Sequence, residues 1–152
     1  MWFDPAMGMA DDARRRLQAK QAESDGRQQA VEECLGLLSS QLARLVPECV
    51  EAFHELGVQP RNLTPHEKNK IFQKRKRMGW ILIGKVGYTH SDHSPWFTIE
   101  VYPDATWTWT GSAPAEQIEN CLRYGKAPLV PEAELREQLS KQVTEIAGAR
   151  GY

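Results

Sequence analysis

The chain has 152 residues, 41% of them hydrophobic and 26% charged, which fits one domain with a modest core and argues against two full domains. Its longest strongly apolar run, Trp80–Ile83, is far shorter than the roughly 20 residues of a membrane-spanning helix, so we expect no membrane association. The net charge is −1, but residues 61–93 hold eight Lys and Arg against two Asp and Glu, and both flanking segments are acidic.

The N-terminal third is predicted to be helical. Residues 1–26 are mostly polar, so we expect a flexible segment that forms at best a solvated helix, with a break at Asp25-Gly26. From Arg27 to Leu56, apolar residues recur at alternating spacings of four and three, which predicts a long amphipathic helix. These residues are Val31, Leu35, Leu38, Leu42, Leu45, Cys49, Ala52 and Leu56. Pro47 predicts a kink, or a stop near Val46 followed by a restart.

This apolar stripe has two interpretations. The first is a helix that packs on the sheet of its own domain, which is the usual role of an amphipathic face. The second is a homodimeric coiled coil through residues 31–56, because the spacing also fits heptads. Pro47 and Gly36 argue against a continuous coiled coil, and we therefore prefer the first interpretation.

A basic run from Lys68 to Arg77 (KNKIFQKRKR) is the most informative feature of the sequence, with six positive charges and no negative one. The segment Thr64–Glu67 before it has the residues of a capped helix start, with proline at the first helical position. Helical spacing then places Lys70, Lys74 and Arg77 on one face. That face is widened by Lys68, Arg75 and Lys76. It either binds an acidic partner or lies solvated beside the acidic segments of the same chain.

The segment after the basic run is rich in β-branched and aromatic residues. Residues 79–88, 96–102 and 106–110 are predicted to form a three-stranded antiparallel meander. In its second strand, alternation places Trp96 and Tyr102 on the face opposite the aliphatic side chains, and in the third Trp107 and Trp109 share a face. These aromatic side chains either pack in the core or form an exposed platform for a partner.

Two helices are predicted after the strands, at residues 114–124 and 131–147. The fold class is therefore α+β, with a long N-terminal helical region kinked near Pro47, the meander, and C-terminal helices packed on one sheet face. We assign residues 27–148 to a single domain and residues 149–152 to a tail.

Catalytic motifs are lacking in the sequence. His90, Asp92 and His93 resemble a metal or acid–base cluster, but the further ligands of a zinc site are not spaced to join them. The three cysteines form no CxxC pair, which predicts reduced thiols and, with no signal peptide at the start, a cytoplasmic protein. We expect no enzyme activity, no cofactor and no metal.

The sequence thus predicts a cytoplasmic interaction module of the adaptor, chaperone, inhibitor or immunity type. Its partner would be an acidic protein, bound by the basic helix and the aromatic hairpin, and a nucleic acid bound at the same surface is the alternative. The candidate contacts are Lys68, Lys70, Lys74, Arg75, Lys76, Arg77, Trp96, Tyr102, Trp107 and Trp109.

Overall fold

The computed structural model of the chain describes residues 8–63, 77–88 and 95–149. The elements in chain order are α1 (Met9–Glu55), β1 (Arg61–Asn62), β2 (Met78–Lys85), β3 (Trp96–Val101), β4 (Trp107–Trp109), α2 (Ala115–Arg123) and α3 (Glu132–Gly148). This α+β order confirms the predicted fold class, and α2 and α3 lie where the two C-terminal helices were predicted.

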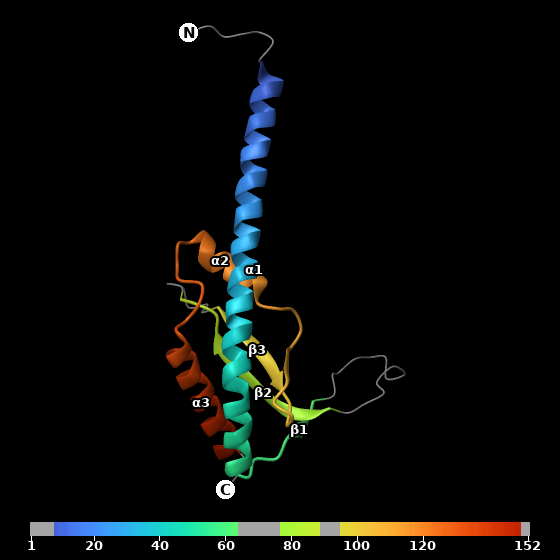
Figure 1. The fold of residues 1–152 in the computed structure, drawn as a ribbon, viewed down its shortest axis with the longest axis vertical. Helices are drawn as coiled ribbons and strands as arrows, with labels where there is room; N and C mark the ends of the chain where they lie inside the picture. The colour runs from blue at the N-terminus through green and yellow to red at the C-terminus, as the bar shows by residue number, and fades with distance from the viewer. Residues whose placement is uncertain (1–7, 64–76, 89–94, 150–152) are drawn as a thin grey trace, which may run out of the picture.

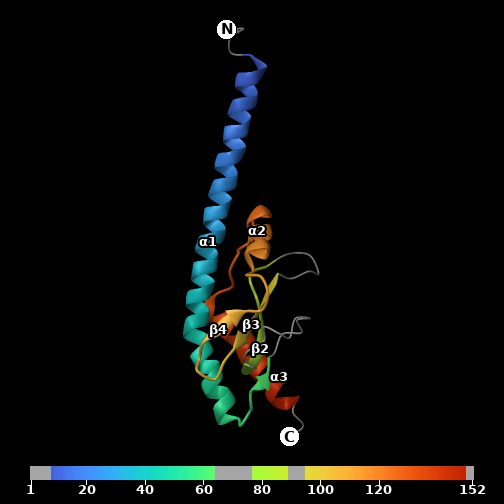
Figure 2. The same ribbon diagram turned by 90° about the vertical axis from the view of Figure 1, so that its right-hand side faces the viewer.

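Helix α1 is one uninterrupted helix of 47 residues, and its N-terminal half extends well beyond the rest of the molecule (Figures 1 and 2). The predicted break at Asp25-Gly26 is wrong, because α1 continues through it. Side chains one turn apart support the helix here: Gln21 donates to Asp25 at 3.0 Å, and Glu23 pairs with Arg27 across Gly26 at 3.6 Å. The stop predicted near Val46 is wrong as well.

Pro47 lies inside α1 with an exposed ring. A proline at this position costs the helix one hydrogen bond, the one to the carbonyl of Ala43. Ala43 is itself exposed, so water can solvate this carbonyl. The neighbours on either side, Val46 and Val50, are buried in the core and hold the helix in place. Tertiary packing therefore overrides the local signal of the proline.

The four strands form one antiparallel sheet in the order β1-β2-β3-β4. The predicted meander corresponds to β2, β3 and β4, and the sheet has one more strand, β1, which pairs with β2 only at Met78 and Gly79. The short Arg61–Asn62 strand has no apolar alternation, so no sequence pattern indicates it.

One face of the sheet, the inner face, is covered by α1 and α3. Trp80 of β2 stacks on Phe53 of α1 with 4.4 Å between ring centroids, and Leu135 of α3 approaches Gly84 so closely that an added Cβ there would lie 3.3 Å from it. The stripe residues Leu38 and Leu42 are at most 1% exposed. The preferred interpretation of the α1 stripe is therefore confirmed, and this stripe is not available for a dimer through residues 31–56.

Two cross-helix ion pairs join α1 to α3 at the surface, Arg44 with Glu132 and Glu48 with Arg136. Their side chains remain 42–60% exposed, so each contributes little to stability. Their geometry instead fixes how the two helices are aligned, since both carboxylates receive the guanidinium Nε–H, at 2.8 Å for Glu132 and 3.1 Å for Glu48.

The burial of α1 predicts that replacing two different leucines of this helix by alanine will change the free energy of unfolding by very different amounts. Leu42→Ala should lower the free energy of unfolding by about 3 kcal/mol, because it leaves a cavity between helix and sheet. Leu37→Ala, at a position 58% exposed, should change it by less than about 0.5 kcal/mol. Urea denaturation followed by tryptophan fluorescence measures both. Equal losses would contradict the packing described above.

Candidate interaction surface

The outer face of the sheet, opposite α1 and α3, carries large exposed apolar side chains. Ile81 and Ile83 of β2 are each 46% exposed, and Trp96 of β3 is 53% exposed. Lys85 lies opposite Trp96 in the register and is also exposed. Exposed apolar side chains gathered on one face are typical of an interaction site.

At one end of this face, Arg77 lies over the ring of Tyr102, with its guanidinium carbon 3.5 Å from the ring centroid. The Tyr102 hydroxyl donates to Glu100 at 2.6 Å and lies 3.2 Å from the Thr108 hydroxyl. Gly79 makes room for the tyrosine, because a Cβ there would lie 3.1 Å from Tyr102 Cδ1 and 2.3 Å from the carbonyl oxygen of Val101. The result is a fixed cation at the end of the apolar surface.

Burial raises the pKa of Tyr102 above its ordinary value, and the hydrogen bond to Glu100 raises it further. Tyr102 is only 5% exposed, so it supports Arg77 from below and offers little surface of its own. The cation, and not the phenol, is the group that faces solvent.

The hydrogen bonding of β2 shows which way its backbone groups point. Val86 N–H donates to the carbonyl of Pro95 at 3.0 Å, toward the β3 side, while Lys85 N–H donates to the side chain of Gln138 on α3 at 2.8 Å. Backbone groups alternate in direction along a strand. Ile83 and Ile81, two and four residues before Lys85, therefore point away from β3.

The pairing of β3 agrees with this assignment. Thr98, which lies opposite Ile83, uses its carbonyl to accept from Thr110 N–H at 3.0 Å, on the β4 side. It is therefore the non-bonded partner of Ile83 within the β2–β3 ladder. On the other side of β2, β1 reaches only as far as Gly79.

The N–H and C=O groups of Ile81 and Ile83 consequently have no backbone partner in the part of the chain that the structure describes. We call this stretch of β2 the open edge. A groove of about 300 Å³ lies beside it, between the end of β1 and the C-terminal part of α3. The groove is lined by Arg61, Leu63, Gly79, Trp80, Ile81, Glu145, Ile146 and Ala149.

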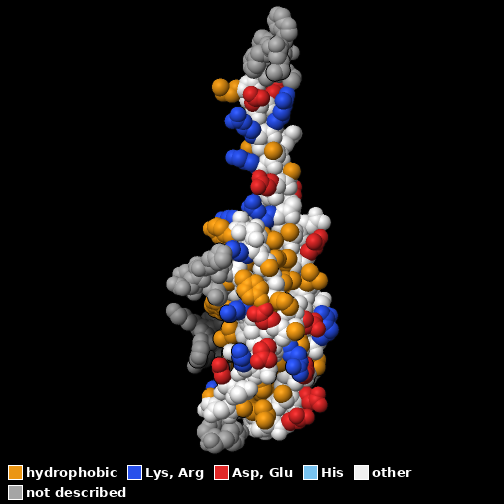
Figure 3. Space-filling model, turned by 90° about the vertical axis from the view of Figure 1, so that its left-hand side faces the viewer, with side chains coloured by type: hydrophobic (Ala, Val, Ile, Leu, Met, Phe, Trp, Pro, Cys, Tyr) orange, Lys and Arg blue, Asp and Glu red, His pale blue; other side chains and the backbone are white. Residues whose placement is uncertain are grey.

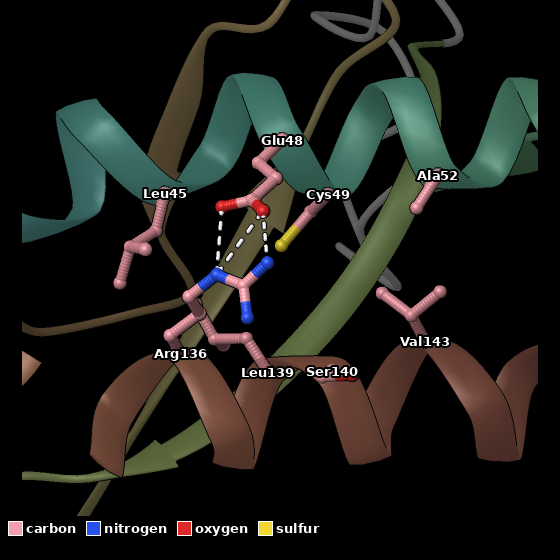
Figure 4. A pocket seen from close by; sticks show the side chains of 8 residues that line it. All are labelled: Leu45, Glu48, Cys49, Ala52, Arg136, Leu139, Ser140 and Val143. Carbon is pink, nitrogen blue, oxygen red and sulfur yellow. Dashed lines mark hydrogen bonds and ion pairs between the residues drawn. The ribbon is translucent and has the colours of Figure 1, made fainter. Parts of the chain in front are cut away.

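A second, smaller hollow of about 110 Å³ lies between α1 and α3 (Figure 4). The ion pair of Glu48 and Arg136 crosses it, and the sulfur of Cys49 points toward the guanidinium (Figure 4). Burial raises the pKa of Cys49 to about 11, so its thiol is protonated at neutral pH and is a weak nucleophile. This hollow therefore has the character of a packing gap between two helices.

The structure separates the aromatic residues predicted for the site. Trp96 and Tyr102 lie on the outer face, as the alternation predicted. Trp107 and Trp109 share a face, also as predicted, but they lie opposite Val101 and Ile99 on the inner face and pack against the core. Trp109 meets Phe97 edge-to-face at 5.9 Å. The aromatic platform is thus reduced to Trp96.

Of the predicted basic contacts, Arg77 is the one whose position is described, and it lies over Tyr102 as stated above. Lys68, Lys70, Lys74, Arg75 and Lys76 lie outside the described residues, as does the predicted helix start at Thr64. The cluster of His90, Asp92 and His93 also lies outside them. Within the described ranges, no group of three or more His, Cys, Asp and Glu side chains could hold a metal ion.

Sequence reasoning missed Ile81, Ile83 and Gln138 as parts of the surface. Both faces of β2 are aliphatic or aromatic, so alternation could not show which face would be covered. The role of Gln138 depends on where α3 docks, and no sequence pattern indicates that.

Comparison with known proteins finds no family model, no curated protein and no solved structure that matches this chain. Among the described residues, no helix combines the length and the apolar character needed to cross a membrane.

The environment of Tyr102 predicts how stability depends on pH. A raised pKa in the folded state means that the neutral phenol stabilises the fold below pH 10, and that this contribution is lost as the pH rises through the pKa of the folded protein. Tyr102→Phe should cost about 1 kcal/mol at neutral pH, because the hydrogen bonds to Glu100 and Thr108 are lost. The variant should also lose less stability above pH 10 than the unmodified protein. Urea denaturation at neutral pH and above pH 10 tests this. If the free energy of unfolding falls equally with pH in the variant and in the unmodified protein, the prediction is contradicted.

Proposed function

We propose that this protein is a non-catalytic interaction module that binds an extended, acidic segment of a partner protein along the open edge of β2. The observation that carries the proposal concerns two backbone positions, Ile81 and Ile83, which have no backbone partner among the described residues and lie beside a groove large enough for side chains. Addition of a strand to an exposed sheet edge is a general mode of peptide recognition, in which main-chain bonds supply affinity and side-chain pockets supply specificity.

An added strand would present its side chains alternately to the two sides of the sheet. On one side they would meet the groove, where Leu63, Ile146 and Ala149 give an apolar lining. On the other side they would lie next to the exposed side chains of Ile81 and Ile83 on the outer face. A segment that alternates apolar residues with acidic ones fits both sides.

The preference for an acidic partner comes from the charges at the two ends of the edge. Arg61 and Arg77 lie at the β1 end, and Lys85 follows Ile83 at the other. The basic run joins β1 to β2, and it returns to the sheet at Arg77, whose carbonyl accepts from Leu63 N–H at 2.8 Å. Arg77 is thus held at the β1 end, and the run adds five more positive charges directly before it in the sequence, which favours attraction of an anionic segment.

A protein partner is favoured over a nucleic acid by the position of the tryptophans. Binding of single strands depends on successive aromatic side chains on which bases stack. Trp107 and Trp109 pack on the covered face, which leaves Trp96 as the exposed tryptophan of the sheet. Roles as an adaptor, chaperone, inhibitor or immunity protein in the cytoplasm are all compatible with such a module.

Proline at position 83 tests the edge directly. In Ile83→Pro the missing N–H is one that points away from β3, so the ladder within the sheet should survive while strand addition is blocked. Ile83→Thr is the matched control, because it changes the side chain but keeps the N–H. Affinity capture from native lysate with nuclease should retain an acidic protein on the unmodified chain and on Ile83→Thr, and lose it on Ile83→Pro. Equal retention by all three would refute strand addition.

Charge reversal tests the acidic character of the partner. Replacing Lys70, Lys74 and Arg77 by Glu should weaken partner binding at least about tenfold at low salt, and should flatten its dependence on salt. The same replacement at Arg123, Lys126 and Lys141, on and beyond α2 and on α3, changes the net charge equally and should have a much smaller effect. Capture that disappears with nuclease, together with a high ratio of absorbance at 260 to 280 nm, would instead establish the nucleic-acid alternative.

A further inference from the structure

The N-terminal part of α1, residues 9–30, projects from the body of the molecule as a bare helix, which we call the arm (Figures 1 and 2). At about 1.5 Å of rise per residue it is about 33 Å long. The first buried residue of α1 is Val31, whereas Met9 is 88% and Leu17 is 65% exposed. The core of the domain therefore gives the arm almost no support.

The arm is held as a helix mainly by local contacts. Arg14 pairs with Asp11 at 3.2 Å, and Arg27 pairs with Glu23 at 3.6 Å. Among the described residues, the one ion pair between the arm and the body is Arg27 with Glu119 of α2, at 4.0 Å. Most helical stability in proteins comes from packing of an apolar face, which the arm lacks, and Gly26 weakens the helix further. A second helix packed along the arm would supply the missing stabilisation.

The charges of the arm occur in blocks of alternating sign, as the space-filling view also shows (Figure 3). Asp11 and Asp12 come first, followed by the basic block of residues 14–20, then Glu23 and Asp25, and finally Arg27. Among the described residues, Arg15, Arg16 and Lys20 of the basic block have no ion-pair partner within the chain. Their partners can therefore come from another molecule.

The order of charges along one arm is complementary to the order along a second arm that runs in the opposite direction. If two arms run antiparallel and cross at Ala19, Asp11 lies opposite Arg27 of the second copy, and Arg15 lies opposite its Glu23. The twofold axis repeats each pairing. If the two arms run parallel and in register, each block instead lies beside its own copy and like charges repel.

One face of the arm allows a second helix to approach closely. Arg15, Ala19, Ala22 and Gly26 recur at spacings of four, three and four, so they share that face. The central alanines and the glycine present little side-chain bulk, and the charged side chains of Arg15 and Glu23 lie at or beside the same face. Close backbone packing and the charge pairs therefore require the same antiparallel arrangement.

We propose that two copies of this chain associate through their arms as an antiparallel pair of helices, crossing near Ala19. The two bodies then lie at opposite ends of the paired arms, so that each keeps its open edge and outer face free. The pairing uses no residue of the proposed partner-binding surface, and either proposal can fail without the other.

Paired charge reversals in the full chain test the association. Sedimentation equilibrium at low salt should show a monomer–dimer equilibrium that weakens as salt is added. Arg15→Glu with Arg16→Glu gives the first half of the arm a net negative charge, although Arg14 stays basic, and should weaken association at least about tenfold. Glu23→Lys with Asp25→Lys should do the same. The chain with all four changes restores opposite signs across the antiparallel pair, so it should recover dimerisation. Tryptophan fluorescence of the body should stay unchanged in every variant.

Cysteine cross-linking tests the orientation. In a Cys34→Ser background, Ala19→Cys should form an intermolecular disulfide, because position 19 meets its own copy at the crossing point. Gly26→Cys should not, because position 26 lies opposite residue 12 in the antiparallel pair; a Cβ at Gly26 meets no atom within 4 Å, so the change itself is harmless. A purely monomeric protein at all concentrations, a cross-link at position 26, or a fourfold variant that stays monomeric would each overturn the proposal.

Discussion

The packing of the α1 stripe on the inner face of the sheet is the contact on which the other features of this protein depend. Phe53 stacks on Trp80 at 4.4 Å, and three leucines of the stripe, Leu38, Leu42 and Leu45, are buried. Burial of these large side chains supplies most of the apolar stabilisation available to a domain of this size. Because both helices that face the sheet lie on one side of it, the other side keeps its isoleucines and Trp96 exposed.

The same contact explains why α1 has two different halves. The stripe begins at Val31, so residues C-terminal to it are fixed in the core, and residues N-terminal to it extend past the sheet without a tertiary partner (Figure 1). The chain therefore combines a rigid body with a bare helix. A helix of this kind usually requires a partner along its length, whereas the open edge offers a different kind of contact at the opposite end of α1.

The two proposed associations use different parts of the molecule. Paired arms would join two copies through charge blocks and small side chains, and each body would bind an extended segment at β2. Two binding sites on one dimer raise the effective concentration of the second binding event when the partner also has two sites. Neither association needs a change in the packed core.

The sequence by itself determined the helical character of residues 27–56, the three-stranded meander, the two C-terminal helices and most of the faces. The spacing of Val31, Leu38 and Leu42 determined the buried side of α1, and alternation in β3 determined which residues face the helices, because these periods of 3.6 and 2 follow from backbone geometry alone. The break expected at Asp25-Gly26 and the stop expected near Val46 do not occur, and at Pro47 core packing on either side outweighs the cost of one lost hydrogen bond.

Only the tertiary structure decided where the surfaces lie. Both faces of β2 are apolar, so the side on which α1 and α3 pack decides which face remains exposed. In the described part of the chain, the open edge exists because β1 pairs no further along β2 than Gly79, and because Gln138 of α3 accepts from Lys85 N–H but not from Ile81 or Ile83. Such pairings join residues far apart in the chain, and neither period nor composition encodes them, because they depend on how whole elements pack together.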